Sequence, residues 1–339
     1  MHIDFILAGA LGLLLILGTT ILWAVAPQVF PLQFFYIILA VILFFSLSRL
    51  DSVYLETLTP IFYVSILILL ILTEIIGVFS HGAVRWLPLG PATLQPSEFA
   101  KPIVALATAW MLTHYGKSLV ISFLLLLLPA ILVFLQPDLT TSAILGVAWL
   151  GVLINSQISL KGLVRLFLPI VLLIFLVFLT LAPYQKERLT SFLQPNRDPA
   201  GTSYQSKQAM IAVGSGGLFG RGLGQGSQTQ LAFLPARQTD FIFASIGEEL
   251  GFIGMFLVLA SFFVIFWRIL AAMFQAKSTF SRMAVGGIFL YLFVQVFVNI
   301  AMNLGMFPVA GVPLPLVSAG GSALISTMMA LGLVMALRK

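Results

Sequence analysis

Three carboxylates stand close together in the stretch "ARQTDFIFASIGEELGFIG", residues 236–254, of a chain in which only 8% of residues are charged. If one helix runs from Asp240, turning about 100° and rising about 1.5 Å per residue, Glu248 lies roughly 80° round and about 12 Å below Asp240, and Glu249 points to the opposite side. This spacing argues against a two-carboxylate hydrolase site. We expect Asp240 to face water and substrate, and Glu248 and Glu249 to bond polar groups inside a bundle.

A second set of polar residues lies in "GAVRWLPLGPATLQPSEFAK", residues 82–101. Glu98 and Lys101 are three residues apart, which puts them on one helix face as a potential ion pair. Arg85 and Trp86 precede them in a connecting loop. Two interpretations stay open, since an intramembrane Glu–Lys pair and an interfacial Trp can serve a ligand or can be purely architectural.

A third set surrounds "GMFPVAGVPLPLVSAGGSALIS", residues 305–326, which is rich in Pro and Gly. Irregular backbone at membrane depth is tolerated only where it is buried in protein or faces a cavity. The next helix could turn its N-terminus toward an anionic group, and its first residues would be Ser318, Gly320, Gly321 and Ser322. The preceding helix carries a polar stripe with a period of four, which interhelical hydrogen bonds would also explain: Gln295, Asn299 and Asn303.

The elements that hold these residues must be membrane helices. With 60% hydrophobic residues among 339, the chain has far more apolar side chains than a soluble core can bury. We therefore predict an all-α, polytopic integral membrane protein, one domain over residues 1–339, with about ten spans. The spans are near 5–26, 29–48, 58–79, 99–113, 118–135, 139–155, 164–183, 240–267, 284–306 and 316–337. The fourth run is short and carries Lys101, so a count of nine stays open.

Orientation follows from the basic residues of the short loops. One side collects Arg49, Lys117, Lys161, Arg165, Arg268, Lys277, Arg282, Arg338 and Lys339, and the other side only Arg85. Both termini are therefore expected in the cytoplasm, with residues 183–238 outside. This bias and anionic lipids account for most of the net charge of +6, so no nucleic-acid partner is expected. The chain has no cysteine, which excludes disulfides, thiolate catalysis and Cys-based metal sites.

The outer segment 183–238 is long enough to be functional or disordered. Its aromatic residues argue against disorder, and residues 204–213 could form a short amphipathic helix at the membrane interface. Seven glycines between Gly214 and Gly226 suggest either a flexible connector, which composition favours, or a backbone cradle for an anion. Nearby cations strengthen the anion alternative: Arg197, Lys207 and Arg221.

Four segments together resemble the SEDS family, the RodA/FtsW/SpoVE proteins of bacterial cell-wall synthesis. They are "LQPSEFAK" (94–101), "QPDLTTSAIL" (136–145), "GSGGLFGRGLGQGSQTQLAFLPARQTDFIFASIGEELGFIG" (214–254) and "GVPLPLVSAGGSALIS" (311–326). The stretch "GQGSQTQLAFLP" is more similar to the RodA branch than to the FtsW branch. The resemblance runs through most of the chain from residue 80 onward.

The resemblance implies a peptidoglycan polymerase of the bacterial cytoplasmic membrane, with its active site outside. Such an enzyme joins lipid II units to a nascent glycan strand, releases polyprenyl pyrophosphate, and works with a class B penicillin-binding protein in the elongation or division machinery. The family's essential aspartate corresponds to Asp240, which would be the general base or would help hold a divalent cation, Mg²⁺ or Mn²⁺; no organic cofactor is expected. Its Glu, Lys and Arg-Trp residues correspond to Glu98, Lys101, Arg85 and Trp86.

The chain departs from the family pattern at Ala236, Gln238 and Ala319, where Glu, His and Tyr are usual. A histidine-assisted proton relay beside Asp240 is therefore excluded. Pyrophosphate charge would be balanced by a subset of Arg85, Lys101, Arg197, Lys207 and Arg221. A lipid II flippase is the alternative function, in which Asp240 would bind or gate. A scaffold without chemistry is a third, weaker possibility.

Overall fold

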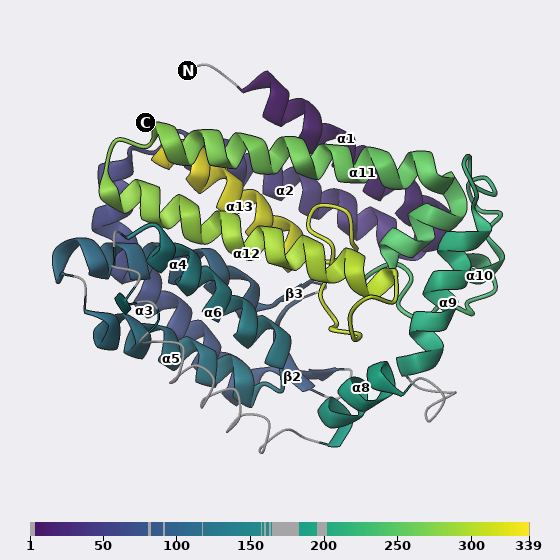
Figure 1. The fold of residues 1–339 in the computed structure, drawn as a ribbon, viewed down its shortest axis with the longest axis horizontal. Helices are drawn as coiled ribbons and strands as arrows, with labels where there is room; N and C mark the ends of the chain where they lie inside the picture. Colours follow the sequence, from purple (N-terminus) through teal and green to yellow (C-terminus); the bar gives the residue numbers. More distant parts are fainter. Residues whose placement is uncertain are drawn as a thin grey trace.

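The computed structural model describes residues 4–80, 83–90, 92–116, 118–156, 158, 161–162, 164, 183–194 and 202–338. The interior of the predicted seventh span, residues 165–182, and Arg197 lie outside the described residues. The nine other predicted spans are helical over most of their length. Their bounds are α1 Phe5–Val25, α2 Phe30–Ser48, α3 Ser52–Ile76, α4 Pro96–His114, α5 Leu119–Leu135, α6 Leu139–Ile154, α11 Ile242–Gln275, α12 Thr279–Asn303 and α13 Gly321–Leu337, with a 3-10 turn, η1 Pro27–Val29, before α2 (Figure 1).

Several of these helices begin where a side chain accepts a backbone N–H that the helix itself leaves free. Asp4 accepts from Leu7, Asp51 from Val53, and Asp138 from Thr141. Asp and Ser are favoured at such positions because their short side chains reach the unpaired donors of the first turn. The acids of this sparsely charged chain are thus partly used to start helices.

The helices pack side by side around small residues. α12 lies against α6 and α4, α13 lies against α2, and α1 packs against α11 (Figure 1). A β-carbon at Gly151 of α6 would come within 2.8 Å of the Gly286 carbonyl oxygen on α12. Membrane helices associate through close approach at small residues, because burial of apolar surface contributes little to their association in lipid.

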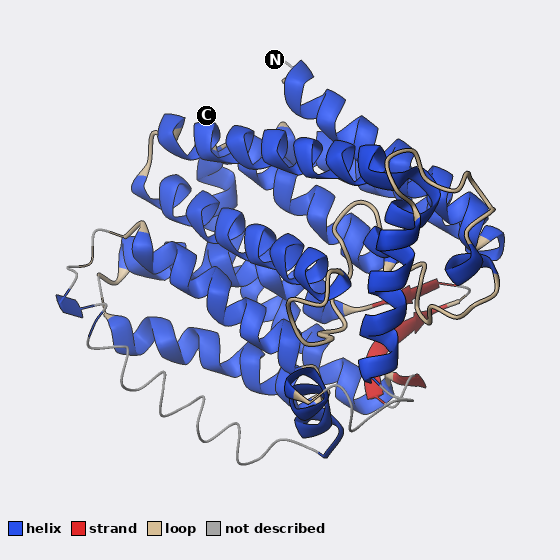
Figure 2. Ribbon diagram, turned by 45° about the vertical axis from the view of Figure 1, so that its right-hand side comes forward, coloured by secondary structure: helices blue, strands red, loops and turns tan. Residues whose placement is uncertain are grey.

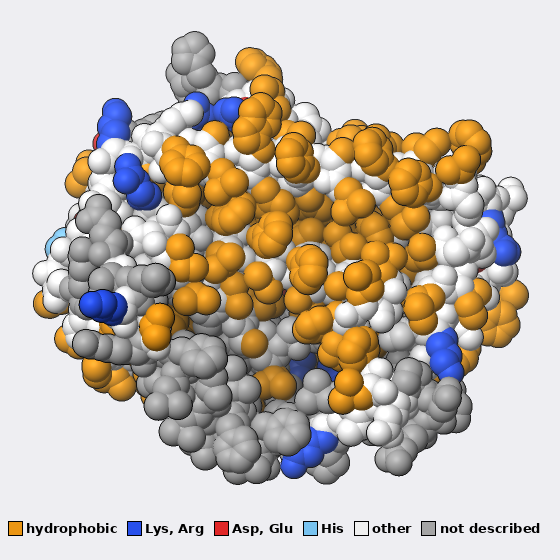
Figure 3. All heavy atoms as spheres, in the orientation of Figure 1, with side chains coloured by type: hydrophobic (Ala, Val, Ile, Leu, Met, Phe, Trp, Pro, Cys, Tyr) orange, Lys and Arg blue, Asp and Glu red, His pale blue; other side chains and the backbone are white. Residues whose placement is uncertain are grey.

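Among the described residues, five helices are long and apolar enough to cross a membrane: α1, the η1–α2 segment, α3, α11 and α12. Three shorter helices, α5, α6 and α13, are also apolar. Figure 3 shows the corresponding surface, with hydrophobic side chains over the middle of the face and most Lys and Arg toward its two sides. The chain is therefore a multi-pass membrane protein, and the number of ten spans stays a prediction.

A small sheet is the exception to the predicted all-α fold. The strands β1 Val78–Ser80, β2 Ala83–Leu89 and β3 Ala92–Leu94 form antiparallel pairs in the order β1-β2-β3. Gly90, with φ +66°, makes the turn between β2 and β3. The predicted third span, 58–79, ends earlier at Ile76, because the chain after Gly77 enters this sheet.

The segment 183–238, predicted to lie outside, contains three short helices among its described residues: α8 Pro183–Leu193, α9 Thr202–Ser215 and α10 Ser227–Gln230 (Figure 2). α9 contains the predicted helix 204–213. It packs against α11, and its Ala209 and Ala212 join a small apolar cluster with Leu234 and Phe241. This part of the outer segment is therefore a packed element of the fold.

Candidate functional site

Asp240 lies in a turn and precedes the helix that was expected to carry it. α11 begins at Ile242, and the N–H groups of Thr239 and Phe241 both bond to the carbonyl oxygen of Ala236, whose φ is +50°. The ideal-helix geometry between Asp240 and Glu248 is therefore wrong. The Asp240 side chain is half-buried, as a group that must reach both protein and water would be.

The polar stripe of α12 holds the backbone of this turn. Asn299 and Asn303 each donate from Nδ2 to the carbonyl oxygen of Asp240, over 3.0 and 2.9 Å. Asn303 also accepts the N–H of Ala244, at the start of α11. Two fully buried amides thus fix the main chain at Asp240.

The same stripe holds the irregular segment between α12 and α13. Asn299 donates to the carbonyl oxygen of Val312 at 2.7 Å, and Gln295 donates to that of Pro313 at 3.2 Å. Ser318 Oγ donates to the carbonyl oxygen of Thr239, beside Asp240, at 2.6 Å. The stripe was predicted, and its role in joining two irregular segments follows from these bonds.

Arg188 of α8 faces the same point as the Asp240 carboxylate. A β-carbon placed on Gly311 would lie 3.6 Å from Arg188 Nη1 and 3.8 Å from Asp240 Oδ2. Gly311 has φ +67°, a conformation that favours glycine. The sequence analysis did not select Arg188, because it lies in a segment without a recognised motif and its nearness to Asp240 arises only in the fold.

Glu98 and Lys101 form the predicted ion pair. Lys101 Nζ lies 2.6 Å from Glu98 Oε2 and 2.9 Å from Gln295 Oε1, and both charged side chains are buried between α4 and α12. Each charge thus has a partner within the bundle without a ligand. Through Gln295, the pair is also connected to the segment that carries Gly311.

Arg85 binds the turn between α5 and α6. It donates to the carbonyl oxygen of Gln136 at 2.8 Å and to that of Pro137, and Nη1 lies 3.9 Å from the Asp138 carboxylate. These contacts join the loop of Arg85 to the signature segment 136–145 and use much of the donor capacity of the guanidinium. Trp86, half-buried, lies opposite Val78 in the sheet.

The small residues before α13 make close protein contacts. Ser322 Oγ accepts the N–H of Gln95 at 2.9 Å, and Gly320 donates its N–H to Gln33 Oε1 at 3.3 Å. A β-carbon at Gly321 would lie 2.4 Å from the ring of Tyr36. Gln33 also donates to the carbonyl oxygen of Ser318. These bonds position the N-terminus of α13, which the sequence suggested as an anion site.

Glu248 and Glu249 both bind the loop 221–230. Glu248 accepts the N–H groups of Gln228 and Thr229, over 2.8 and 2.9 Å. Glu249 accepts the N–H of Gly224 at 3.1 Å and bonds to the side chains of Thr229 and Gln230. Neighbouring helical residues lie only about 100° apart, so one loop across the helix reaches both.

Three of the seven glycines between Gly214 and Gly226 pack closely on α11: Gly216, Gly220 and Gly226. A β-carbon at Gly216 would lie 1.9 Å from the carbonyl oxygen of Gly247, and one at Gly220 would lie 2.1 Å from that of Glu249. The backbone is held in place at these contacts, so this part of the segment is not the flexible connector that composition favoured. Of the two described cations of this region, Lys207 is exposed on α9, and Arg221 is exposed and donates to Ser215 and Ser227.

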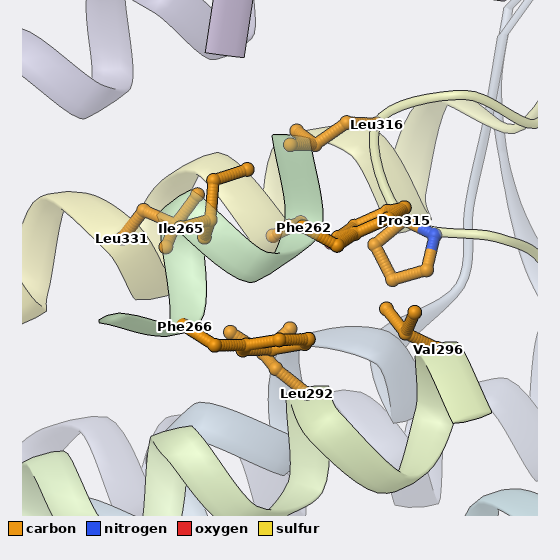
Figure 4. A pocket seen from close by; sticks show the side chains of 9 residues that line it. Phe262, Ile265, Phe266, Leu292, Val296, Pro315, Leu316 and Leu331 are labelled. Carbon is orange, nitrogen blue, oxygen red and sulfur yellow. The ribbon is translucent and has the colours of Figure 1, made fainter. Parts of the chain in front are cut away.

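An apolar cavity lies elsewhere in the bundle, between α11, α12 and α13 (Figure 4). It is lined by Phe262, Ile265, Phe266, Leu292, Val296, Pro315, Leu316, Thr327 and Leu331. None of these side chains titrates, and Asp240 is not among them. With a volume of about 10 Å³ the cavity has room for little more than a water molecule, so it is a packing defect and not the site of the chemistry expected at Asp240.

Metal ligands are sparse in the described part of the chain. It contains no group of three or more His, Asp or Glu side chains that could hold an ion. Asp240 offers one carboxylate, and Arg188 faces it across Gly311. Asp240 alone could therefore supply one ligand only, and a cation there would need phosphate oxygens and water for the remaining ligands, as Mg²⁺ commonly does.

Comparison with known proteins gives matches over the whole chain. A family model described as Cell cycle protein, FtsW/RodA/SpoVE, matches residues 1–339. The peptidoglycan glycosyltransferase MrdB of Escherichia coli K12 is 39% identical over 350 residues, which cover 99% of this chain and 93% of MrdB. Stage V sporulation protein E of Bacillus subtilis is 36% identical over 278 residues, 79% of this chain and 75% of that protein.

Solved structures agree with these matches. A chain from a peptidoglycan synthase complex that coordinates polymerization and crosslinking has a TM-score of 0.84 and 30% identity, with coverage of 100% of this chain and 98% of that one. The rod shape determining protein RodA of Thermus thermophilus has a TM-score of 0.75 and 28% identity, with coverage of 100% and 97%. The predicted resemblance is confirmed: this chain belongs to the FtsW/RodA/SpoVE family, the SEDS proteins.

Proposed function

We propose that this protein is a peptidoglycan glycosyltransferase that joins lipid II disaccharide-peptide units into glycan strands. The observation that carries the proposal is Asp240, a half-buried carboxylate whose backbone is fixed by Asn299 and Asn303 and whose side chain faces Arg188. Family membership and the glycosyltransferase relatives support the same chemistry.

The reaction requires a base and a means of stabilising the leaving group. A hydroxyl of the acceptor sugar attacks the anomeric carbon of the donor, the bond from that carbon to the phosphate oxygen breaks, and polyprenyl pyrophosphate leaves. Asp240 takes the hydroxyl proton as general base. Because these bonds fix the main chain at Asp240, the residue needs little rearrangement before it reacts, and this lowers the cost of reaching the transition state.

Arg188 is the cation we assign to the pyrophosphate, because it faces the same space as Asp240. Guanidinium groups bind phosphate oxygens through two parallel hydrogen bonds, which suits a leaving group whose negative charge grows. Two of the other predicted cations bind protein groups: Lys101 is buried in its ion pair with Glu98, and Arg85 binds the α5–α6 turn. We assign both of these to positioning.

The proposal includes a divalent cation, Mg²⁺ or Mn²⁺, only as an ion that binds together with the substrate. Asp240 would supply its single protein carboxylate, and pyrophosphate oxygens and water the remaining ligands. Such a cation would neutralise charge on the leaving group. Chelator treatment followed by titration with each metal should restore product formation in a saturable way, and activity unaffected by the chelator would remove the metal from the proposal.

The enzyme works at the outer face with both termini in the cytoplasm. Support comes from the basic inner loops and from the bond between Arg338 and Asp4, which joins the two ends of the chain. A class B penicillin-binding protein is the partner we infer, in the elongation or division machinery. The similarity to a chain of a peptidoglycan synthase complex that couples polymerization and crosslinking supports it.

The test is polymerisation of purified lipid II by the protein with a class B partner whose transpeptidase is blocked. Asp240→Asn should reduce glycan formation by about 10²- to 10⁴-fold, the usual contribution of a general base. Glu74→Gln, which neutralises an exposed carboxylate of α3, is the matched control and should retain activity. Folding of each variant is checked by its melting temperature.

The same assay distinguishes the flippase alternative. Equal product from wild type and Asp240→Asn would remove Asp240 as the base. No product from either, together with wild-type transfer of labelled lipid II across vesicles, would favour transport. A cell that grows normally with Asp240→Ala would instead favour a scaffold without chemistry.

A further inference from the structure

The segment 216–224 carries apolar side chains that the outer position of this loop does not explain. Leu218 is 64% exposed, Phe219 78% and Leu223 42%, although the segment connects two outer helices, α9 and α10. Single exposed apolar residues are ordinary, but three within six positions on one well-anchored loop form a surface that water disfavours. The segment is outside the candidate site at Asp240.

The backbone of this segment is bonded to α11 where that helix is kinked. Gly251 has φ +66° and ψ −160°, so the regular hydrogen bonds of α11 are interrupted there. The N–H groups of Phe252 and Ile253 donate to the carbonyl oxygens of Gly217 and Leu218, over 2.9 and 3.2 Å.

In the other direction, the N–H groups of Arg221 and Gly222 donate to the carbonyl oxygens of Glu248 and Glu249, over 2.9 and 3.1 Å. The segment thus bonds to the peptide groups that the kink leaves unpaired. Non-helical backbone can lie at membrane depth only if its polar groups are satisfied in this way.

The depth of the segment follows from the length of α11. Between Phe252 and Arg268 the helix rises about 24 Å, and between Phe252 and Gln275 about 35 Å. Arg268 bonds to Asp4, near the N-terminus, and Gln275 bonds to Arg338, near the C-terminus. Arg338 also bonds to Asp4, so all four residues lie at the same end of the molecule. These two lengths bracket the hydrocarbon thickness of about 30 Å, so Phe252 and the segment bonded to it lie at the opposite boundary of the hydrocarbon.

The apolar side chains of the segment continue a surface that already faces lipid. Phe252, Ile253 and Phe256 of α11 are 55%, 45% and 56% exposed. In Figure 3 the hydrophobic side chains over α11 extend to the right-hand end of the molecule. Arg221, exposed in the middle of the segment, supplies a cation at the level where phospholipid phosphates lie.

We propose that residues 216–224 form a membrane-inserted wedge, with Leu218 and Phe219 among the acyl chains of the outer-leaflet phospholipids and Arg221 at their phosphates. The occupant is phospholipid because the wedge is continuous with the lipid-facing surface of a membrane-spanning helix and lies at the boundary of the hydrocarbon. It does not depend on the glycosyltransferase function.

Site-directed spin labelling tests the wedge directly, since the chain has no cysteine to remove. The variants Leu218→Cys and Phe219→Cys are labelled and reconstituted, as the full chain alone, into vesicles of phosphatidylethanolamine and phosphatidylglycerol. The lipid-facing control is Phe256→Cys on α11, and the aqueous control is Lys207→Cys on α9. All four positions are exposed, so labelling leaves the packing intact.

We expect the ratio of oxygen to nickel-complex accessibility at positions 218 and 219 to be severalfold higher than at position 207 and close to that at position 256. Both cysteines should also react slowly with a water-soluble maleimide. Nickel accessibility at both positions equal to that at Lys207→Cys would overturn the proposal. In that case the apolar surface would be left for a protein partner, since these vesicles contain none.

Discussion

At the scale of single residues, Arg188 is the side chain whose role the structure changes most. It faces the Asp240 carboxylate across Gly311, whereas Lys207, also in the outer segment, is exposed on α9. We expect Arg188→Ala to lower polymerisation by about 10²- to 10³-fold, as the loss of one stabilising donor does in other enzymes, and Lys207→Ala to have a much smaller effect. Steady-state rates with purified lipid II measure both.

Arg188→Lys separates bidentate binding from simple charge. A lysine retains the positive charge but cannot form the planar pair of hydrogen bonds, so we expect only partial recovery relative to Arg188→Ala. Full activity of Arg188→Ala at a normal melting temperature would remove Arg188 from the site. Equal losses in Arg188→Ala and Lys207→Ala would instead indicate a diffuse electrostatic effect.

Glu98 and Lys101 give a second prediction at the residue scale. Removal of one partner leaves the other charge buried and uncompensated, which costs about 3–5 kcal/mol, whereas removal of both leaves no such charge. Glu98→Gln and Lys101→Met should therefore each lower the stability of the protein more than the double variant does. Thermal unfolding in detergent measures this cycle, and additive losses would show that the pair has no coupling.

At the scale of elements, the contact between the outer segment and α11 depends on residues without side chains. Gly220 has φ +80° and a β-carbon there would lie 2.1 Å from the Glu249 carbonyl oxygen, so Gly220→Ala must move one backbone away from the other. We expect a marked decrease in melting temperature. Gly214→Ala is the matched control, because a β-carbon at this position meets nothing within 4 Å.

The control also has an expected sign. Gly214 lies inside α9, where alanine stabilises a helix by about 0.5–1 kcal/mol relative to glycine. Gly214→Ala should therefore melt at the wild-type temperature or above it. Equal destabilisation by both variants would mean that flexibility, and not close contact with α11, is what the glycines provide.

The same elements show how far sequence could go. Long apolar runs predicted the helices well, and the spacing of Glu98 and Lys101 predicted their pairing. The predicted span began at Asp240 because the mostly apolar stretch "FIFASIG" follows it directly. The turn at Asp240 is fixed by Ser318 and Asn303, from segments far along the chain. Arg188, Gln295 as the third member of the ion-pair cluster, and the loop over Glu248 and Glu249 likewise depend on contacts that no local pattern contains.

At the scale of the whole molecule, one carboxylate joins both ends of the chain to α11. Asp4 Oδ2 accepts from Arg268 Nε at 2.8 Å and lies 3.3 Å from Arg338 Nη1. Burial by itself would raise the pKa of the Asp4 carboxyl. Hydrogen bonds from Arg268 and Leu7 and the charges of Arg268 and Arg338 outweigh burial and hold the pKa below its ordinary value of 3.8.

A lowered pKa makes the contribution of Asp4 to stability depend on pH in a defined direction. It is fully present above the unfolded-state pKa and is lost as pH falls through the lower folded-state pKa. Asp4→Asn should therefore melt below wild type at neutral pH, and the difference should shrink as the pH falls below about 4. Asp51→Asn, at the exposed cap of α3, should show a smaller difference at neutral pH, since no ion pair of Asp51 is found among the described residues. The difference in melting temperature between wild type and Asp4→Asn could instead stay constant down to acid pH. Asp4 would then act as a helix cap alone, and apolar packing would hold the ends of the chain together.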